Sequence, residues 1–385
     1  MRNISIGIDL GTYTTRAVAI SHEKDQDQVI GTVSVQTKGL RHGYVVNAKD
    51  ATDTIKKVSH LLEKSIGTKV KRALVSIGGI TVSSIMAQGS TIITKADTEI
   101  TELDVENAIK VSEDTLPLTN RKIIYKSVIG FKIDGKEVHG RPEGMKGAKL
   151  EVRVLFVTCL LQHLEDLESV FFDAGIEIIE ILPSSIAAAE VALTPKQKMV
   201  GCALLNIGSE TVSIAVYDNQ SLIGLHVFQI GSSDITNDIA LGLKISLEEA
   251  EQIKIGSLIT TIPRKKLEEI IEARLSDIFE LVENYLKKLK RSELLPAGII
   301  LTGGGSGLSN IESFSKATLN LPSKIGDAEI ITHKGAIRDA TWYVAYGLAL
   351  LSEEYETGGS SHGVFGTTFK KFKKNSSSFF RQFLP

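Results

Sequence analysis

Cysteine, proline and long apolar runs are scarce in this sequence, and each scarcity excludes a class of protein. The two cysteines among 385 residues, Cys159 and Cys202, lie in apolar runs with no CxxC spacing and no histidine partner. A disulfide scaffold or a structural zinc site built on cysteine ligands is therefore excluded, and a reducing compartment is expected. With 8 prolines against 33 glycines, tight turns and close backbone contacts to a ligand are favoured over rigid linkers.

No apolar run approaches the roughly 18 residues of a spanning helix, and the first residues lack a signal-peptide pattern. We therefore expect a cytoplasmic protein that is not integral to a membrane. Hydrophobic residues make up 42% and charged residues 23% of the chain, as expected of a soluble folded protein. The length predicts two or three domains.

The net charge of −2 conceals an uneven distribution of charge. Residues 357–385 carry five cations and no acid, so the rest of the chain has 39 basic against 46 acidic residues. A basic tail on an acidic body argues against a general nucleic-acid binder and for a local anionic target.

The order of predicted elements indicates an α/β protein made of two similar halves. A strand, a glycine turn and a second strand occupy residues 4–20, and the same layout returns at 202–218. Residues 81–150 differ in texture and predict a small inserted α+β module. Ser246 and Glu249 form a predicted capping box at the start of a helix. Further helices are expected at 50–66, 102–114, 162–174, 183–193, 264–290 and 342–351, and further strands at 73–79, 152–161 and 297–302.

Three glycine-containing turns could bind phosphate or a flat ring. Asp9-Leu10-Gly11-Thr12 ends the first strand, where free amide groups could face phosphate oxygens and Asp9 could hold water on a divalent cation. Asn206 to Thr211 repeat that layout, and Gly303-Gly304-Gly305 follow an apolar strand. Paired turns, one in each half, can hold a polyphosphate between two domains. The plainer interpretations are two ordinary hairpins and a mobile glycine loop.

Glu251 and Lys254 lie three residues apart on one helical face. They could hydrogen-bond ribose hydroxyls, or they could form a surface ion pair. Several familiar motifs are missing from the sequence: GxxxxGK[ST], GxGxxG after a strand, HExxH and GxSxG. Scattered histidines such as His163 and His226 are expected at the surface or as satisfied core residues.

The C-terminal segment FKKFKKNSSSFFRQFLP has the pattern of an amphipathic helix that lies on a membrane. Its aromatic residues share one helical face and most of its cations lie outside that face, with Lys373 the exception. Docking on the protein's own surface and a disordered basic tail are the alternatives. The predicted membrane-binding residues are Phe369, Lys370, Lys371, Phe372, Lys374, Phe379, Phe380, Arg381, Phe383 and Leu384.

The order of the DLGT, NIGSET, AEQIK and GGG segments resembles that of the actin-like ATPases. Within that group the chain resembles the FtsA family of bacterial cell-division proteins over nearly its whole length. The segments RHGYVVNAKDATDTIKK, ITELDVENAIKVSE and PAGIILTGGGSGLSNIE carry the likeness, together with the inserted module and the amphipathic tail.

The resemblance implies duplicated actin-like (ribonuclease H-like) domains around a nucleotide cleft, with ATP and Mg²⁺ as cofactors. No residue receives a certain catalytic role, and Asp9 would meet Mg²⁺ through water. The implied nucleotide-binding residues are Asp9, Gly11, Thr12, Tyr13, Asn206, Gly208, Ser209, Glu210, Thr211, Gly231, Glu251, Lys254, Gly303, Gly304 and Gly305.

The resemblance also implies how the chain is divided and which partners it meets. It implies a protein that polymerises and anchors FtsZ filaments to the cytoplasmic side of the cell membrane at the division site. The FtsZ tail would dock near 226–297. The implied parts are a first actin-like domain at 1–80 and 162–195, an inserted subdomain at 81–161, a second domain at 196–225 and 298–355, a small subdomain at 226–297, a linker at 356–368 and a membrane helix at 369–385.

One departure from the family pattern predicts slow or negligible ATP hydrolysis. The second turn usually begins with Asp and continues with glycines, whereas this chain has Asn206, Ser209 and Glu210. An amide cannot act as a base, and Glu210 adds negative charge near phosphates. A PilM-like pilus-assembly protein, a small-molecule kinase and a chaperone are the alternative functions, and none of them explains the amphipathic tail.

Overall fold

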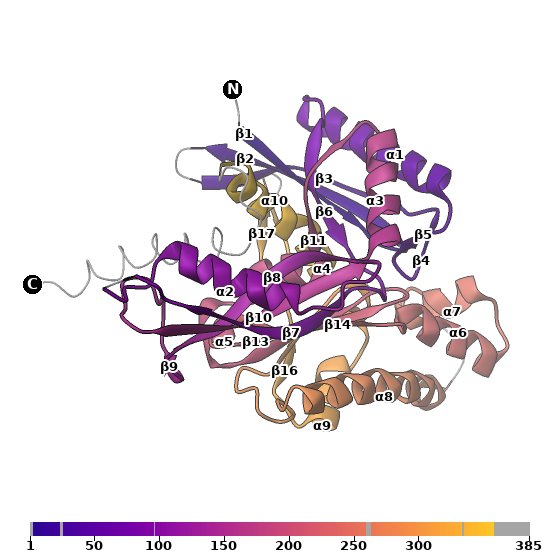
Figure 1. The fold of residues 1–385 in the computed structure, drawn as a ribbon. Helices are drawn as coiled ribbons and strands as arrows, with labels where there is room; N and C mark the ends of the chain where they lie inside the picture. The colour runs from indigo at the N-terminus through magenta and orange to yellow at the C-terminus, as the bar shows by residue number, and fades with distance from the viewer. Residues whose placement is uncertain (1–2, 24–25, 96, 259–262, 333–334, 358–385) are drawn as a thin grey trace, which may run out of the picture.

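Two large β-sheets with helices packed on their faces make up the molecule (Figure 1). The computed structural model describes residues 3–23, 26–95, 97–258, 263–332 and 335–357. The predicted linker beyond residue 357 and the predicted membrane helix at 369–385 lie outside the described residues. Within the described part of the chain, no helix combines the length and apolar character needed to cross a bilayer.

The first sheet has seven strands, in the order β11-β6-β1-β2-β3-β17-β18. The predicted hairpin is confirmed, because β1 and β2 pair antiparallel with Asp9 opposite Arg16. Strands β6 and β11 add in parallel to the other side of β1. The strand bounds are β1 Asn3–Leu10, β2 Thr14–Glu23, β3 Gln26–Gln36, β6 Arg72–Ile77, β11 Glu177–Pro183, β17 Ile330–Thr332 and β18 Gly335–Ile337.

The second sheet has nine strands, in the order β16-β15-β12-β13-β14-β7-β10-β8-β9. Its first five strands repeat the topology of the first sheet: β12, β13 and β14 form an antiparallel meander, and β15 and β16 add in parallel. The predicted duplication is therefore present in the strand order. These strands are β12 Cys202–Ile207, β13 Val212–Asp218, β14 Ser221–Phe228, β15 Ile299–Thr302 and β16 Ser323–Ile325.

The inserted α+β module continues this second sheet. Its strands are β7 Ser83–Ile92, β8 Arg121–Ile133, β9 Lys136–Val138 and β10 Lys149–Leu160, and β7 joins β14 through the pair His226 and Ser83. Helix α2 (Glu102–Asp114) covers them so closely that a Cβ on Gly89 would lie 2.0 Å from the Ala108 carbonyl oxygen. The module has a hydrophobic core of its own around Val105 and Phe156.

Two helices connect the halves. Helix α4 (Ser184–Ala192) contacts strands of both sheets, and α10 (Tyr343–Thr357) packs on β1 and on α4. The glycines on this path leave no room for a side chain: a Cβ on Gly7 would lie 2.3 Å from the Ala345 carbonyl oxygen, and one on Gly347 would lie 1.9 Å from the Ala187 carbonyl oxygen. The core between the sheets therefore depends on close backbone contact at both crossings.

The remaining helices cover the outer faces. Helix α1 (Ala48–Ile66) begins at the N-cap Asn47 and ends at Gly67 in the left-handed conformation, and it packs on β2, β3 and α3 (Leu161–Asp173). Helices α6 (Ser232–Leu243), α7 (Leu247–Lys254) and α8 (Arg264–Lys288) share one hydrophobic core with the second sheet. The short elements are α5 Pro195–Val200, α9 Ile311–Leu319, β4 Leu40–Arg41, β5 Tyr44–Val45 and the 3₁₀ turns η1 Gly304–Gly307 and η2 Ala340–Trp342.

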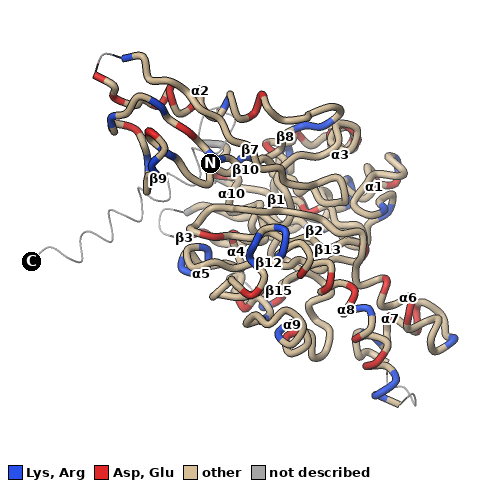
Figure 2. The backbone as a smooth tube through the Cα atoms, turned by 60° about the horizontal axis from the view of Figure 1, so that its bottom comes forward, with Lys and Arg blue, Asp and Glu red and all other residues tan. Residues whose placement is uncertain are grey.

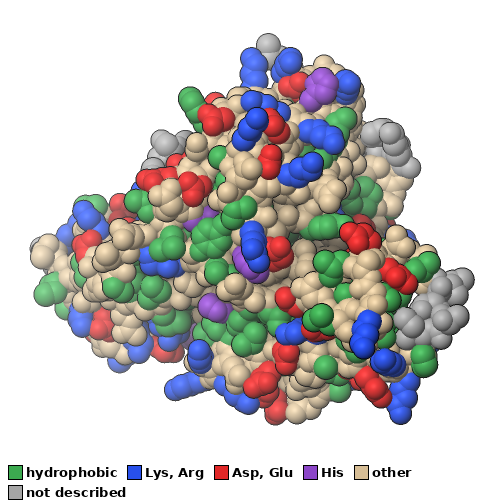
Figure 3. Space-filling view, turned by 90° about the vertical axis from the view of Figure 1, so that its right-hand side faces the viewer, with side chains coloured by type: hydrophobic (Ala, Val, Ile, Leu, Met, Phe, Trp, Pro, Cys, Tyr) green, Lys and Arg blue, Asp and Glu red, His purple; other side chains and the backbone are tan. Residues whose placement is uncertain are grey.

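Charges of both signs are mixed over the described surface. In Figure 2, segments of Lys and Arg and segments of Asp and Glu are scattered among the other residues along the backbone. On the face drawn in Figure 3, hydrophobic side chains lie between charged ones of either sign. Neither view shows an extended area of a single charge.

Candidate functional site

The first predicted turn joins β1 to β2. A Cβ on Gly11 would lie 2.7 Å from the Thr14 carbonyl oxygen, so the turn requires glycine. Asp9 accepts a 2.7 Å hydrogen bond from the Ser76 hydroxyl, which in turn accepts one from the backbone N–H of Leu10. Burial raises the pKa of Asp9 above its ordinary value, and the Ser76 hydrogen bond and the charge of Arg16 act in the opposite direction.

The second predicted turn joins β12 to β13 and rests on the start of α6. The Gly208 N–H donates to the Thr211 carbonyl at 2.8 Å, which closes the turn. The Ser209 carbonyl accepts from the Ser233 N–H at 2.8 Å, and the two serine hydroxyls hydrogen-bond at 2.5 Å. A Cβ on Gly231 would lie 2.2 Å from the Ser209 carbonyl oxygen, so this position also excludes a side chain.

A loop between β4 and β5 contacts both turns. The His42 N–H donates to Glu210 Oε2 at 2.5 Å, across from one half of the molecule to the other. The next N–H, of Gly43, donates to Thr12 Oγ1 at 3.1 Å. Two consecutive residues therefore hold the first and second turns, which are about two hundred residues apart in sequence.

This loop is fixed in place by a buried histidine. His163 Nε2 hydrogen-bonds with the Gly43 carbonyl at 3.0 Å, and its Nδ1 hydrogen-bonds with Thr81 Oγ1 at 2.8 Å. The ring also stacks on Tyr44, with centroids 4.5 Å apart. Burial lowers the pKa of His163, which favours the neutral ring. The expectation that this histidine is a core residue with hydrogen-bond partners is confirmed. Its hydrogen bonds hold in place the loop that contacts both turns.

The triple-glycine turn packs against the second turn. Gly303 has φ +83°, and a Cβ on it would lie 2.3 Å from Asn206 Oδ1. A Cβ on Gly305 would lie 2.3 Å from Ile207 Cγ2, whereas one on Gly304 would meet nothing within 4 Å. Two of the glycines thus allow close packing, and the middle one borders open space. The alternative of a loose, mobile loop does not fit these close contacts.

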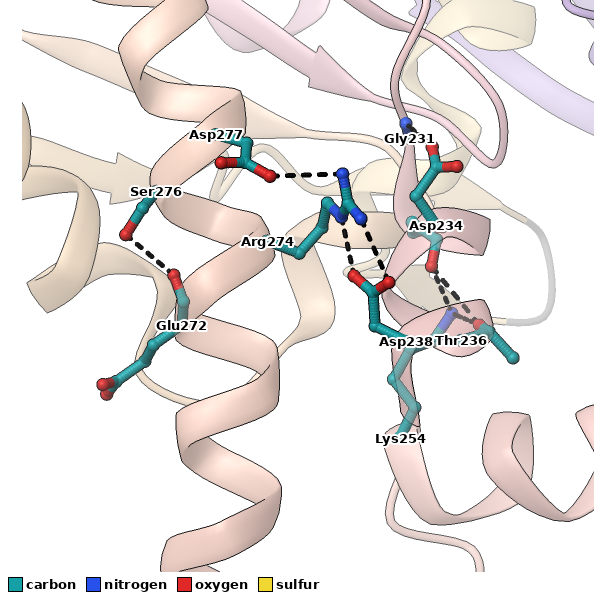
Figure 4. Close-up of polar contacts among 10 residues, drawn as sticks. Gly231, Asp234, Thr236, Asp238, Lys254, Glu272, Arg274, Ser276 and Asp277 are labelled. Atoms are coloured by element: carbon teal, nitrogen blue, oxygen red, sulfur yellow. Dashed lines mark hydrogen bonds and ion pairs between the residues drawn. The ribbon is translucent and has the colours of Figure 1, made fainter. Parts of the chain in front are cut away.

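Glu251 and Lys254 form an ion pair at 2.7 Å, in which the Glu251 side chain is 38% exposed. The Lys254 side chain is only 5% exposed. Its ammonium donates to the Ser232 carbonyl at 3.0 Å and to Thr236 Oγ1 at 2.8 Å, so it lies against the first turn of α6 (Figure 4). Thr236 donates to Glu251 Oε2 at 2.5 Å. Because Ser232 N–H donates to the Gly208 carbonyl, the pair belongs to the surroundings of the second turn.

Not every predicted residue joins this network to the same degree. Tyr13 is 58% exposed, while its carbonyl accepts from the Thr37 N–H at 2.9 Å. The Ser246 hydroxyl accepts from the Glu249 N–H at 3.2 Å, which is one of the two hydrogen bonds of the predicted capping box. The predicted membrane-binding residues lie outside the described part of the chain.

Several residues that hold the site together were not predicted from sequence. Ser76 binds Asp9, Ser232 and Thr236 bind Lys254, and His42 with Gly43 links the two turns. The loop of His42 carries one signal detectable in the sequence, the glycine after Arg41 and His42, and in the structure this Gly43 has φ +81°. The sequence cannot reveal that this loop contacts residues in the opposite half.

Solved structures define the class to which this fold belongs. The chain is similar to a structure titled PilM-PilN type IV pilus biogenesis complex, with 16% identity and a TM-score of 0.68 over 91% of this chain and 99% of that one. It is also similar to MreB5 of Spiroplasma citri bound to ADP, with 14% identity and a TM-score of 0.53 over 97% of this chain and 98% of that one. The protein has the duplicated, actin-like α/β fold with an inserted subdomain.

Comparisons of sequence narrow this class to a family. The family model "Cell division protein FtsA" matches residues 203–347, and the model "SHS2 domain inserted in FTSA" matches residues 79–158. The Cell division protein FtsA of Pseudomonas aeruginosa is 26% identical over 94% of this chain and 93% of its own length. The chain belongs to the FtsA family of cell-division proteins.

Proposed function

We propose that this cell-division protein binds ATP with Mg²⁺ between its two glycine turns and, as a filament, anchors FtsZ to the inner face of the cytoplasmic membrane. The contact that best supports nucleotide binding is the loop of His42 and Gly43, which hydrogen-bonds both turns. Because adjacent residues hold the two turns, both turns can bind the same polyphosphate.

The residues around the turns fit such a ligand. Gly304 borders open space, as the adenosine side of the site requires. Arg16 Nε, across the strand pair from Asp9, is buried with no hydrogen-bond partner among the described residues, which leaves a donor beside the first turn. Asp9 carries a raised pKa because of burial, and a nearby divalent cation would favour its charged form.

In this proposal each part of the site has a separate role. Gly11, Thr12 and Tyr13 form the first phosphate turn, and Gly208 to Thr211 form the second, with Gly231 behind it. Glu251 and Lys254 serve the ribose, with the partly exposed Glu251 carboxylate as its acceptor and Lys254, whose three N–H groups have protein partners, holding Glu251 in place. Gly303 to Gly305 hold the adenosine. Asp9 orients water on Mg²⁺, which would neutralise phosphate charge.

We further propose that hydrolysis is slow. Asn206 lies against Gly303 and has no carboxylate with which to accept a proton from water. The Glu210 carboxylate accepts a hydrogen bond from the His42 N–H, and this bond joins the two halves. We therefore assign Glu210 this structural role and no role as a base in hydrolysis.

The open space beside Gly304 allows a direct test of nucleotide binding. A leucine at Gly304 meets no protein atom within 4 Å of its Cβ, so the fold should tolerate it, yet it would fill the proposed adenosine position. The matched control is Gly307→Leu, because a Cβ on Gly307 also meets nothing within 4 Å. We expect Gly304→Leu to abolish the fluorescence change of a labelled ATP analogue and Gly307→Leu to retain it. Equal binding by both variants would refute the proposed site.

The anchoring role rests on membership of the family and on the composition of the tail. We propose that residues 369–385 bind an anionic leaflet, with 356–368 as a linker, and that helices α6 to α8 of the 226–297 subdomain receive the FtsZ tail. Liposome flotation of the full chain and of a chain ending at residue 364 tests the first part. Binding that persists without residues 365–385 would refute it.

The PilM-like alternative rests on one observation, the TM-score of 0.68 with the pilus-complex structure. At 16% identity that likeness shows only the fold. A pull-down with an FtsZ C-terminal peptide separates the two functions. Failure to capture the peptide would move the assignment toward pilus assembly.

A further inference from the structure

Three side chains that commonly ligate metals meet where the β2–β3 hairpin lies against the end of α10. His22 Nδ1 is 2.7 Å from Asp27 Oδ1 and 3.3 Å from Glu353 Oε2. The three ligand atoms all lie within 4.8 Å of one another. The cluster is remote from the glycine turns, because His22 lies eight residues beyond Thr14 along β2, roughly 26 Å at about 3.3 Å per residue.

The spacing of these atoms suits a small cation. Tetrahedral zinc–ligand bonds of about 2.0 to 2.2 Å place neighbouring ligand atoms roughly 3.3 to 3.6 Å apart. The 3.3 Å between His22 Nδ1 and Glu353 Oε2 fits this spacing, whereas the 2.7 Å between His22 Nδ1 and Asp27 Oδ1 is a hydrogen-bond distance that must lengthen to admit a cation. The His22 side chain is 7% exposed, whereas those of Asp27 and Glu353 are 49% and 43% exposed. One side of the cluster is therefore buried and fixed, and the other is open to water that could complete the coordination.

The second nitrogen of the same ring has its own partner. His22 Nε2 hydrogen-bonds with Ser5 Oγ at 2.8 Å, and Ser5 is fully buried on β1. A carboxylate can only accept, so without a cation the 2.7 Å hydrogen bond to Asp27 has Nδ1–H as its donor. With a cation bound, the other tautomer donates Nε2–H to the Ser5 hydroxyl and presents the Nδ1 lone pair to the ion. Metal-bound histidines characteristically donate their other ring N–H in this way, which fixes the ring and its tautomer.

We propose that His22, Asp27 and Glu353 bind a first-row divalent cation of the Zn²⁺ type, with water at the exposed positions. One imidazole and two carboxylates favour such an ion over Ca²⁺, which takes six to eight oxygen ligands, and over Mg²⁺, which prefers oxygen in octahedral geometry. The cation joins the hairpin to the helix that connects the two halves. It therefore fixes the end of α10 to the first sheet, independently of any nucleotide.

Cobalt provides a spectroscopic probe for this site. The full chain, stripped with EDTA and dialysed, is titrated with Co²⁺, and the visible absorption of protein-bound Co²⁺ is recorded. We expect one equivalent to bind, Zn²⁺ to displace it, and excess Mg²⁺ to leave it in place. We also expect added Zn²⁺ to raise the midpoint of thermal unfolding, because the ion binds the folded state.

Variants assign the binding to these residues. His22→Gln and Glu353→Gln should each weaken Co²⁺ binding at least tenfold, and Ser5→Ala should weaken it roughly tenfold to a hundredfold through loss of ring orientation. The controls are His139→Gln, in the loop after β9, and Glu280→Gln, on α8; both residues are exposed, and both variants should bind as the wild type does.

Two results would overturn the proposal: no Co²⁺ binding by the wild type, or unchanged binding by both His22→Gln and Glu353→Gln. If His22→Gln fails to fold in EDTA, Glu353→Gln and Asp27→Asn decide the question, since both side chains are about half exposed. Displacement of Co²⁺ by Mg²⁺ at similar concentration would refute the Zn²⁺-type assignment.

Discussion

Replacing Glu210 tests whether the two halves are linked through the second turn. Its Oε2 accepts the His42 N–H at 2.5 Å, and its side chain and that of His42 are 29% and 30% exposed. A hydrogen bond to a charged group contributes about 1.5–3 kcal/mol to stability. Because water can reach both partners, we expect Glu210→Ala to cost about 1.5 kcal/mol, near the lower end of that range.

Glu210→Gln is the matched variant, since it keeps a side-chain acceptor of the same length and removes only the charge. A neutral hydrogen bond still contributes about 0.5–1.5 kcal/mol, so this variant should lose less than the alanine variant. Urea unfolding gives the stabilities. Hydrogen exchange of the peptide that contains residues 40–45 reports on the bond itself, and we expect faster exchange in Glu210→Ala than in Glu210→Gln.

The same pair of variants separates structure from charge in nucleotide binding. If phosphates lie beside the second turn, Glu210→Gln should bind ATP more tightly than the wild type, because it removes a negative charge and keeps the link to His42. Unchanged exchange at residues 40–45 in Glu210→Ala would refute the link between the halves. Unchanged ATP affinity in Glu210→Gln would argue against phosphate at this turn.

Three further predictions follow from single contacts. Without nucleotide or Mg²⁺, Asp9→Asn should gain stability over the wild type as pH rises from 3.8 through the raised pKa of Asp9, because the wild type must then ionise a carboxyl whose charged form burial disfavours. Thermal unfolding from pH 3 to 8 measures the stability of both proteins, and the same dependence on pH in both would contradict this prediction. Asn206→Asp should increase phosphate release, and no gain would remove Asn206 as the cause of slow turnover. Gly89→Ala should lower the free energy of unfolding by about 1–3 kcal/mol, because its Cβ would lie 2.0 Å from the Ala108 carbonyl oxygen. Gly130→Ala is the control, since a Cβ there meets no atom within 4 Å and should be tolerated far better. Equal midpoints of urea unfolding for the two variants would contradict this reasoning.

Local patterns in the sequence predicted most of the elements. The β-rich runs at 4–10 and 15–20 indicate strands, and the structure has β1 and β2 there. The helices predicted at 50–66 and 102–114 are observed at Ala48–Ile66 and Glu102–Asp114. Such features depend on residues near one another in the chain, so the sequence displays them directly.

The sequence alone also indicated two similar halves, but it did not predict every strand that completes them. Strand β3 (Gln26–Gln36) was not predicted, although it is the counterpart of β14 in the second sheet. Its sequence mixes polar residues with valines and gives a weak apolar signal. Pairing with β2 along its length forms the strand, and that pairing is a tertiary contact.

The sequence by itself determined the two glycine turns, the triple-glycine turn and the ion pair, because each needs a particular residue type at a short spacing. Only the tertiary structure decided what they contact. It buried Lys254 against α6, placed Gly303 on Asn206, and set His42 and Gly43 between the turns. It also brought His22 beside Glu353, more than three hundred residues away. Contacts between distant segments depend on how sheets and helices pack in three dimensions, and no short stretch of sequence records that packing.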